Sequence, residues 1–238
     1  MQVCLPNTSD QMIGVIFLNY LRKEYSDKAL QSISVQNIDF EVLQVEQKGI
    51  SKAINIGLNH FFENRKADYV FICANDIELP IGAFNKMIHV ASHIPETGVS
   101  AIHCVESLPD LQKVNGQDIC PAWGVFGNYL LTKAAFDKIG YWNEDQDPYG
   151  MNDSDYCYRL HKAGFLNYYI YGLHANHLGS DVHSGTDYRK MKDEGLNKAA
   201  NIFGKWQKTY DLGNLYIPYL QEDYIIKMNQ MYGENCQD

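Results

Sequence analysis

The sequence predicts an α/β fold, with a central, mostly parallel sheet and helices on both faces, in a single domain. Two observations support this prediction. Within the first hundred residues, short apolar runs alternate three times with amphipathic runs, as strands and helices do in parallel sheets. The chain has 238 residues, of which 45% are hydrophobic, enough for one large domain with a buried core.

The first half supplies the three predicted strand–helix units. Each strand is a short, continuous apolar run, as expected for a sheet that is covered on both faces. The predicted strands span 12–18, 40–45 and 68–73. The predicted helices end near Val35, cover 49–64 with apolar residues at helical spacing, and run from Pro80 to about His93.

Polar residues follow each of these three strands. Asn19, Glu46 and the pair Asn75-Asp76 stand just after the apolar runs. Ligands of such sheets bind beyond the carboxyl ends of the strands, so these residues are the first candidates for a binding site. Mg²⁺ and Mn²⁺ prefer oxygen ligands and leave positions open for phosphate oxygens, which suits the Asp76 carboxylate. The alternative is an acid that favours the start of the next helix.

The second half is less regular. Strands are predicted at 123–131 and 165–171. Helices are predicted at 133–139, about 153–162 and about 187–207. Gly164 stands where a glycine commonly ends a helix.

The predicted organisation is one domain followed by an extension. The domain covers 1–210, with a nucleotide-binding half at about 12–100 and an acceptor or catalytic half at about 101–210. Residues 211–238 contain Tyr, Leu and Ile and are expected to pack on the domain.

An acidic segment, 145–155, precedes the second of these later helices. Asp153, Cys157 and Leu160 share one helical face, so Asp153 begins a helix whose apolar side is packed. A carboxylate held in such a place is a candidate general base. Helix capping is the alternative, because Asn152 and Asp153 are both good caps.

A second cluster contains histidines. His174, His177 and His183 fall within ten residues of one another, and neutral imidazole is a common metal ligand. Gly172 and Gly179 indicate a loop there rather than a helix. A structural role for each histidine remains the alternative.

Charge and cysteine usage limit the classes of partner. The net charge of −9 disfavours nonspecific binding of long polyanions, although 189–208 is locally basic. The six cysteines form no CxxC pair and are expected to be buried thiols in a reducing compartment. We expect no signal peptide and no membrane span. The expected location is the cytoplasm, with attachment to a membrane surface left open.

Taken together, these segments resemble glycosyltransferase family 2 over roughly 13–206. The order and spacing of the motifs carry the resemblance. The matching segments are Phe17-Leu18-Asn19-Tyr20, Val45-Glu46-Gln47, 48–57, Asn75-Asp76-Ile77, 124–142, 152–160, 162–165, 177–180 and Gly204-Lys205-Trp206. Two positions depart from the family pattern, because Asn75 and Asn152 replace acids.

The resemblance implies a GT-A fold and inverting, metal-dependent transfer from a nucleoside-diphosphate sugar. A UDP-sugar is the expected donor, and a glycan, a lipid-linked sugar or another hydroxyl is the expected acceptor. Asp153 would be the general base, while Asp76 and His177 would hold Mn²⁺ or Mg²⁺. The donor-binding residues implied are Asn19, Glu46, Gly49, Lys52, Asn55, Asn75 and Asp76. The acceptor-binding residues implied are Trp123, Gly124, Trp142, Asn152 and Asp155. Core packing is the alternative for the two tryptophans.

Three other functions stay open at this point. The same chemistry could act on a modified nucleobase in DNA, as in phage-type enzymes, which the basic stretch would suit. A non-catalytic sugar- or metal-binding module of the same fold is motivated by Asn75 and Asn152. A nucleotidyltransferase is the weakest option, since it would need a glycine-rich loop after the first strand and 19–27 contains no glycine.

Overall fold

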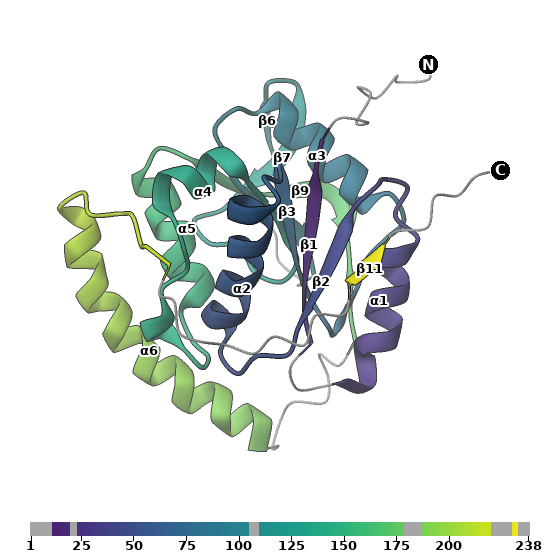
Figure 1. Cartoon of the computed structure of the whole chain (residues 1–238). Helices are drawn as coiled ribbons and strands as arrows, with labels where there is room; N and C mark the ends of the chain where they lie inside the picture. Colours follow the sequence, from purple (N-terminus) through teal and green to yellow (C-terminus); the bar gives the residue numbers. More distant parts are fainter. Residues whose placement is uncertain (1–10, 20–22, 105–109, 179–186, 220–229, 233–238) are drawn as a thin grey trace.

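The computed structural model describes residues 11–19, 23–104, 110–178, 187–219 and 230–232. At its centre these residues form a nine-stranded sheet in the order β11-β2-β1-β3-β8-β5-β9-β7-β6 (Figure 1). The β1–β2, β1–β3 and β5–β9 ladders are parallel, and the remaining ladders of this sheet are antiparallel. None of the helices in these residues is long and apolar enough to cross a membrane.

The strand–helix order predicted for the first half is confirmed. The strands are β1 (Ile13–Leu18), β2 (Glu41–Val45) and β3 (Tyr69–Ala74). The helices are α1 (Ser26–Ser34), α2 (Ile50–Leu58), which continues as a π-helical segment (Asn59–Asn64), and α3 (Ala83–His93). Ile77–Glu78 forms the short strand β4 ahead of Pro80. The third helix begins later than predicted because Gly82, with a φ of 76°, lies outside the helical conformation.

The second half differs more from the prediction. The strand predicted at 123–131 is wrong over most of its length, since β8 covers only Tyr129–Thr132. The strands β5 (Thr97–His103), β6 (Gln112–Val114) and β7 (Gln117–Pro121) were not predicted. The later elements follow the prediction closely: α4 (Lys133–Ile139), α5 (Asn152–Lys162), β9 (Leu166–His174) and α6 (Asp187–Asp211). Gly164 ends α5 with a φ of 89°, the conformation that favours glycine.

Alternate side chains of the strands fill two cores, one on each face of the sheet. Ile16 and Ile72 pack with residues of α2, α4 and α5. Val15 and Phe71 pack with residues of α1 and α3 on the other face. Figure 1 shows the sheet between these two groups of helices, with α6 running outside α5. The predicted α/β fold with helices on both faces is therefore confirmed.

The cysteines are thiols in the part of the chain described. Cys73, Cys120 and Cys157 are buried and free, and Cys104 is free and partly buried. Cys4 and Cys236 lie outside the described residues, as does His183 of the histidine cluster.

The described residues after α6 pack against the domain, and backbone pairing ties them to it at two places. Ile217 bridges to the end of α4, where its N–H donates to the Ile139 carbonyl at 3.0 Å and its carbonyl accepts from Tyr141 N–H at 2.9 Å. The short strand β11 (Gln230–Tyr232) pairs antiparallel with β2. The boundary predicted near residue 210 stays a prediction.

Candidate active site

The polar residues that follow β1, β2 and β3 lie together at the carboxyl edge of the sheet. Asn19 is buried and links them: its Nδ2 lies 3.4 Å from Glu46 Oε1, and its Oδ1 accepts a hydrogen bond from Ser26 Oγ at 2.7 Å. Asn75 Nδ2 donates to the same Ser26 hydroxyl at 3.2 Å. These four side chains therefore form a continuous polar row, in which Ser26 was not anticipated from the sequence.

Asp76 and His177 are brought together although 101 residues separate them. The short strand β10 (Asn176–His177) pairs antiparallel with β4, and Leu178 N–H donates to the Asp76 carbonyl at 2.7 Å. Asp76 Oδ2 and His177 Nε2 lie 3.4 Å apart. Their side chains are 15% and 28% exposed, so both are accessible to a ligand from outside.

This pair fits a divalent cation that has further ligands outside the protein. Among the described residues, no group of three or more His, Cys, Asp or Glu side chains is arranged to hold a metal ion. A structural zinc site needs four protein ligands and does not fit. Mg²⁺ and Mn²⁺ keep several positions for water and phosphate oxygens, so one carboxylate and one imidazole beside a diphosphate suit them.

Asp153 lies at the start of α5, half-buried, as its shared face with Cys157 and Leu160 predicted. Tyr129, the first residue of β8, donates its hydroxyl to Asp153 Oδ1 at 2.9 Å. Burial raises the pKa of Asp153 to about 6, and the Tyr129 hydrogen bond opposes this rise. Because β8 runs antiparallel to β3, Tyr129 stands beside the carboxyl end of β3, on the edge that carries Asp76.

Asn128, which precedes Tyr129, is a second residue that the sequence did not single out. Its Oδ1 accepts a hydrogen bond from Ala74 N–H at 2.8 Å, at the end of β3. This contact ties the loop before β8 to the turn that carries Asn75-Asp76. The only signal for Asn128 and Tyr129 was their place in 124–142, the segment that resembles the acceptor side of the family.

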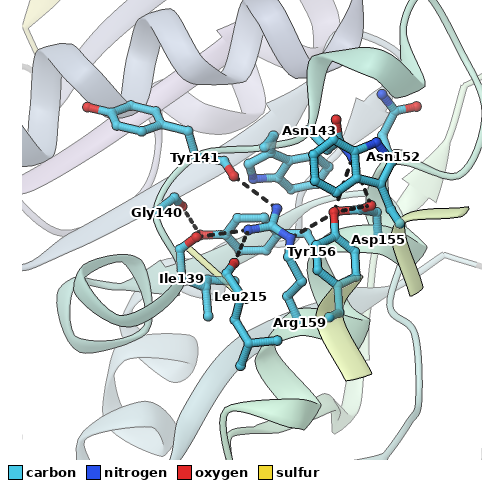
Figure 2. A network of polar contacts seen from close by, with 12 residues as sticks. Ile139, Gly140, Tyr141, Asn143, Asn152, Asp155, Tyr156, Arg159 and Leu215 are labelled. Atoms are coloured by element: carbon cyan, nitrogen blue, oxygen red, sulfur yellow. Dashed lines mark hydrogen bonds and ion pairs between the residues drawn. The ribbon is translucent and has the colours of Figure 1, made fainter. Parts of the chain in front are cut away.

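Asp155, predicted to bind the acceptor, instead belongs to a buried polar network (Figure 2). It is fully buried and pairs with Arg159, whose Nε lies 2.9 Å from Asp155 Oδ1. The hydroxyl of Tyr210 and Nδ2 of Asn143 donate to Oδ2 at 2.8 and 3.3 Å. Arg159 also donates to the backbone carbonyls of Ile139, Tyr141 and Leu215. Both carboxylate oxygens are thus occupied, and the geometry supports a structural role.

Gly49, Lys52 and Asn152 lie around Asp147, which caps α2. Asp147 accepts hydrogen bonds from Ser51 N–H at 2.8 Å and Lys52 N–H at 3.1 Å. Gly49 has a φ of 101°, and a Cβ there would stand 2.5 Å from Asp147 Oδ2, so this close approach requires glycine. Asn152 Nδ2 donates to Asp147 Oδ1 and to Ser51 Oγ at 3.1 and 2.7 Å. These contacts join the start of α2 to the segment that precedes α5.

Asn55 and Trp142 are also joined to each other. Asn55 Nδ2 donates to the Trp142 carbonyl at 3.0 Å, and Trp142 N–H donates to Asn55 Oδ1 at 2.8 Å. Trp142 is 1% exposed and its indole stacks with the rings of Tyr129 and Tyr156. A side chain buried to this degree is not available to a sugar, so the core-packing alternative describes it better than the predicted acceptor role.

Trp123 and Gly124 lie on the loop between β7 and β8. Trp123 is 49% exposed, with its ring edge-on to Tyr158 and Phe203 at centroid distances of 5.9 and 6.3 Å. Phe126 on the same loop is also exposed. An exposed aromatic ring is a surface on which a sugar ring packs well, and the acceptor role of this loop stays a prediction.

No family model matches this sequence, and a search of curated protein sequences gives no match. Solved structures do match. The catalytic domain of Drosophila beta1,4galactosyltransferase 7, in complex with xylobiose, is 14% identical, with a TM-score of 0.51 over 77% of this chain and 79% of that one. The Pyrobaculum calidifontis mannosyltransferase PcManGT, in complex with GDP-Man and Mn²⁺, is 13% identical, with a TM-score of 0.55 over 76% of this chain and 60% of that one.

A third solved structure, S. aureus TarS in complex with UDP, is 14% identical, with a TM-score of 0.51 over 69% of this chain and 59% of that one. The chain thus spans less than two thirds of PcManGT and of this TarS structure. All of these are GT-A glycosyltransferases. The likeness establishes that this chain has the GT-A fold.

Proposed function

We propose that this protein is an inverting, metal-dependent glycosyltransferase that moves a sugar from a nucleoside-diphosphate donor to an acceptor hydroxyl. The observation that carries the proposal is the contact of Asp153, whose pKa of about 6 suits a general base, with Tyr129. Tyr129 pairs with β3 near its carboxyl end, and this strand leads to Asp76, which lies beside His177. The fold supports it, and so do the GDP-Man, UDP and Mn²⁺ in structures that this chain resembles.

The donor would bind across the carboxyl ends of β1, β2 and β3. The polar row of Glu46, Asn19 and Asn75 offers carboxylate and amide groups to the nucleoside. Asp76 and His177 would hold Mn²⁺ or Mg²⁺ against the diphosphate. When bound, the metal supplies Lewis-acid stabilisation of the charge on the leaving phosphate. A UDP-sugar is the donor we expect.

The acceptor would bind on the side of Asp153. The Asp153 carboxylate takes the proton from the acceptor hydroxyl as the oxygen forms a bond to the anomeric carbon and the nucleoside diphosphate leaves. A base with a pKa near 6 is largely ionised at pH 7 and still basic enough to help. Attack on the face opposite the leaving group inverts the anomeric centre.

The donor site is tested by thermal unfolding with UDP-, GDP- and dTDP-sugars, each with and without Mn²⁺ or Mg²⁺. One of them should raise the melting temperature only when metal is present, because a ligand of the native state stabilises by mass action, about 2.7 kcal/mol at a hundred times its Kd. Asp76→Ala should abolish this rise. Glu78→Ala is the matched control, since Glu78 contacts Asn176 and Lys28 rather than His177.

The proposal fails if no nucleotide sugar stabilises the protein in the presence of metal. It also fails if Asp76→Ala is stabilised as much as the wild type. If a nucleotide sugar binds but is neither hydrolysed nor transferred, the protein is a non-catalytic binding module of the same fold.

A further inference from the structure

We infer that Tyr129 is a positioning residue for the general base: its hydroxyl fixes one oxygen of the Asp153 carboxylate and leaves the other for the acceptor. This inference rests on the proposed function for its catalytic meaning. The hydrogen bond itself stands on the structure alone.

The contact is directed at a single oxygen. Tyr129 is 3% exposed, and its hydroxyl donates to Asp153 Oδ1 at 2.9 Å. Among the residues that the structure describes, no donor reaches Asp153 Oδ2. Catalytic bases are commonly held in this way: a hydrogen bond to one atom orients the base, while another atom faces the reacting proton.

The position of the Tyr129 hydroxyl is fixed from two sides. The backbone is held in the middle of the sheet, where Tyr129 stands opposite Ile72 of β3 and Ala101 of β5. The ring lies parallel to that of Trp142, with an interplanar angle of 6° and centroids 5.9 Å apart. Asn55 holds the Trp142 backbone through two hydrogen bonds. The sheet and α2 therefore jointly set where the hydroxyl points.

The hydrogen bond acts on the ionised form of Asp153. Burial raises the pKa of this carboxyl to about 6, and the Tyr129 hydroxyl lowers it because it donates to the carboxylate. The other titratable side chains that face Asp153 are Cys157 on α5 and Tyr169 on β9. Asp155 and Arg159, also on α5, are paired with each other. Removing the Tyr129 hydroxyl therefore raises the pKa of Asp153 further and frees the carboxylate to rotate.

The test compares Tyr129→Phe with Tyr156→Phe. Tyr156 is the matched control: it also stacks on Trp142, is buried, and its hydroxyl donates to the Gly140 carbonyl at 3.2 Å rather than to Asp153. Both substitutions thus remove the hydrogen bond of one tyrosine hydroxyl from the same stack. Carbon-13 NMR of the carboxyl groups, in protein without metal or substrate, gives the pKa of Asp153, with Asp153→Asn identifying its signal.

We expect Tyr129→Phe to raise the pKa of Asp153 by about one unit or more, the size of a hydrogen bond to a charged group. Tyr156→Phe should leave this pKa unchanged. An unchanged pKa in Tyr129→Phe, or an equal shift in both variants, overturns the inference.

The catalytic half of the inference has its own readout. In Tyr129→Phe the acidic limb of the pH–rate profile should move up by the same number of units as the NMR titration, and kcat should fall while KM for the nucleotide sugar is unchanged. An NMR shift without the matching kinetic shift overturns the catalytic role. If the wild type transfers no sugar, the proposed function fails, while the NMR result still decides whether Tyr129 controls Asp153.

Discussion

Asp153 and Asp155 stand two residues apart on the first turn of α5 and have opposite surroundings. Asp155 is fully buried, pairs with Arg159 at 2.9 Å, and accepts further hydrogen bonds from Tyr210 and Asn143. Asp153 is half-buried and accepts one side-chain hydrogen bond, from Tyr129. A single acidic motif thus places one carboxylate in an ion pair and the other beside a neutral hydroxyl.

The comparison of Asp153 with Asp155 shows that the effect of burial on a carboxyl group depends on whether a counter-ion is present. A buried carboxylate with a buried counter-ion keeps its charge and joins the elements around it. A carboxylate that loses much of its contact with water and has no counter-ion becomes easier to protonate, and the pKa of Asp153 rises to about 6 for this reason. Only the second is suited to exchange a proton near neutral pH.

The largest effect on stability is expected at Asp155. Asp155→Asn leaves the guanidinium of Arg159 buried without its counter-ion, which should lower the free energy of unfolding by about 3–5 kcal/mol. Urea unfolding measures this. The double variant Asp155→Asn/Arg159→Met should recover most of the loss, because it removes the uncompensated charge. A loss below about 1 kcal/mol in the single variant would show that the pair does not hold this region together.

A smaller effect is expected from Asp153, and it depends on pH. Its folded-state pKa of about 6 lies above the ordinary value of 3.8, so protonation favours the folded state. The stability it contributes is fully present below about pH 4 and is lost as pH rises through about 6. The Asp153→Asn variant has no carboxyl group at this position, so its stability does not fall in this way as the pH rises.

Between about pH 4 and 6 the free energy of unfolding of Asp153→Asn should therefore rise relative to that of the wild type by roughly 1–3 kcal/mol. Above this range the difference between the two proteins should stay constant. Urea titrations at a series of pH values measure the difference. A difference that is the same at every pH would mean that Asp153 titrates alike in the folded and unfolded states.

The smallest expected effect on stability concerns Asp147, which is compared with Asp145, another acid of the segment 145–155. Asp147→Ala removes the hydrogen-bond acceptor at the N-terminus of α2 and should cost about 0.5–2 kcal/mol of stability. Asp145→Ala is the control, because Asp145 is exposed and contacts the Trp206 indole at the surface; it should change stability by less than about 0.5 kcal/mol. Equal losses in the two variants would argue against a capping role for Asp147.

The sequence was sufficient for the features that depend on local patterns. Apolar runs and their spacing predicted the first three strands and the main helices, and the shared helical face of Asp153 and Cys157 predicted how Asp153 begins α5. The order of the strands also predicted that Asn19, Glu46 and the pair Asn75-Asp76 would lie at the carboxyl ends of the strands, where ligands bind. The pairing of Asp76 with His177 came from the family resemblance, because nothing local links the two.

The remaining features depend on contacts between distant segments, which a local pattern does not report. The acidic motif did not separate Asp153 from Asp155, since the partner Tyr210 comes from α6 and Tyr129 from β8. The antiparallel insertion of β8 between β3 and β5 was missed for the same reason. The sequence leaves both acceptor binding and core packing open for Trp142, because a local pattern does not identify Tyr129 and Tyr156 as the rings that cover it.

The most direct test of the proposed division between Asp153 and Asp155 is the turnover of the stabilising nucleotide sugar by wild type and Asp153→Asn from pH 5 to 8. We expect kcat/KM of the wild type to fall below about pH 6, as the base becomes protonated. Asp153→Asn should remain folded and lose about 10²–10⁴-fold in kcat at every pH. A folded Asp153→Asn protein with wild-type turnover and the same pH dependence would contradict the assignment of Asp153 as the base.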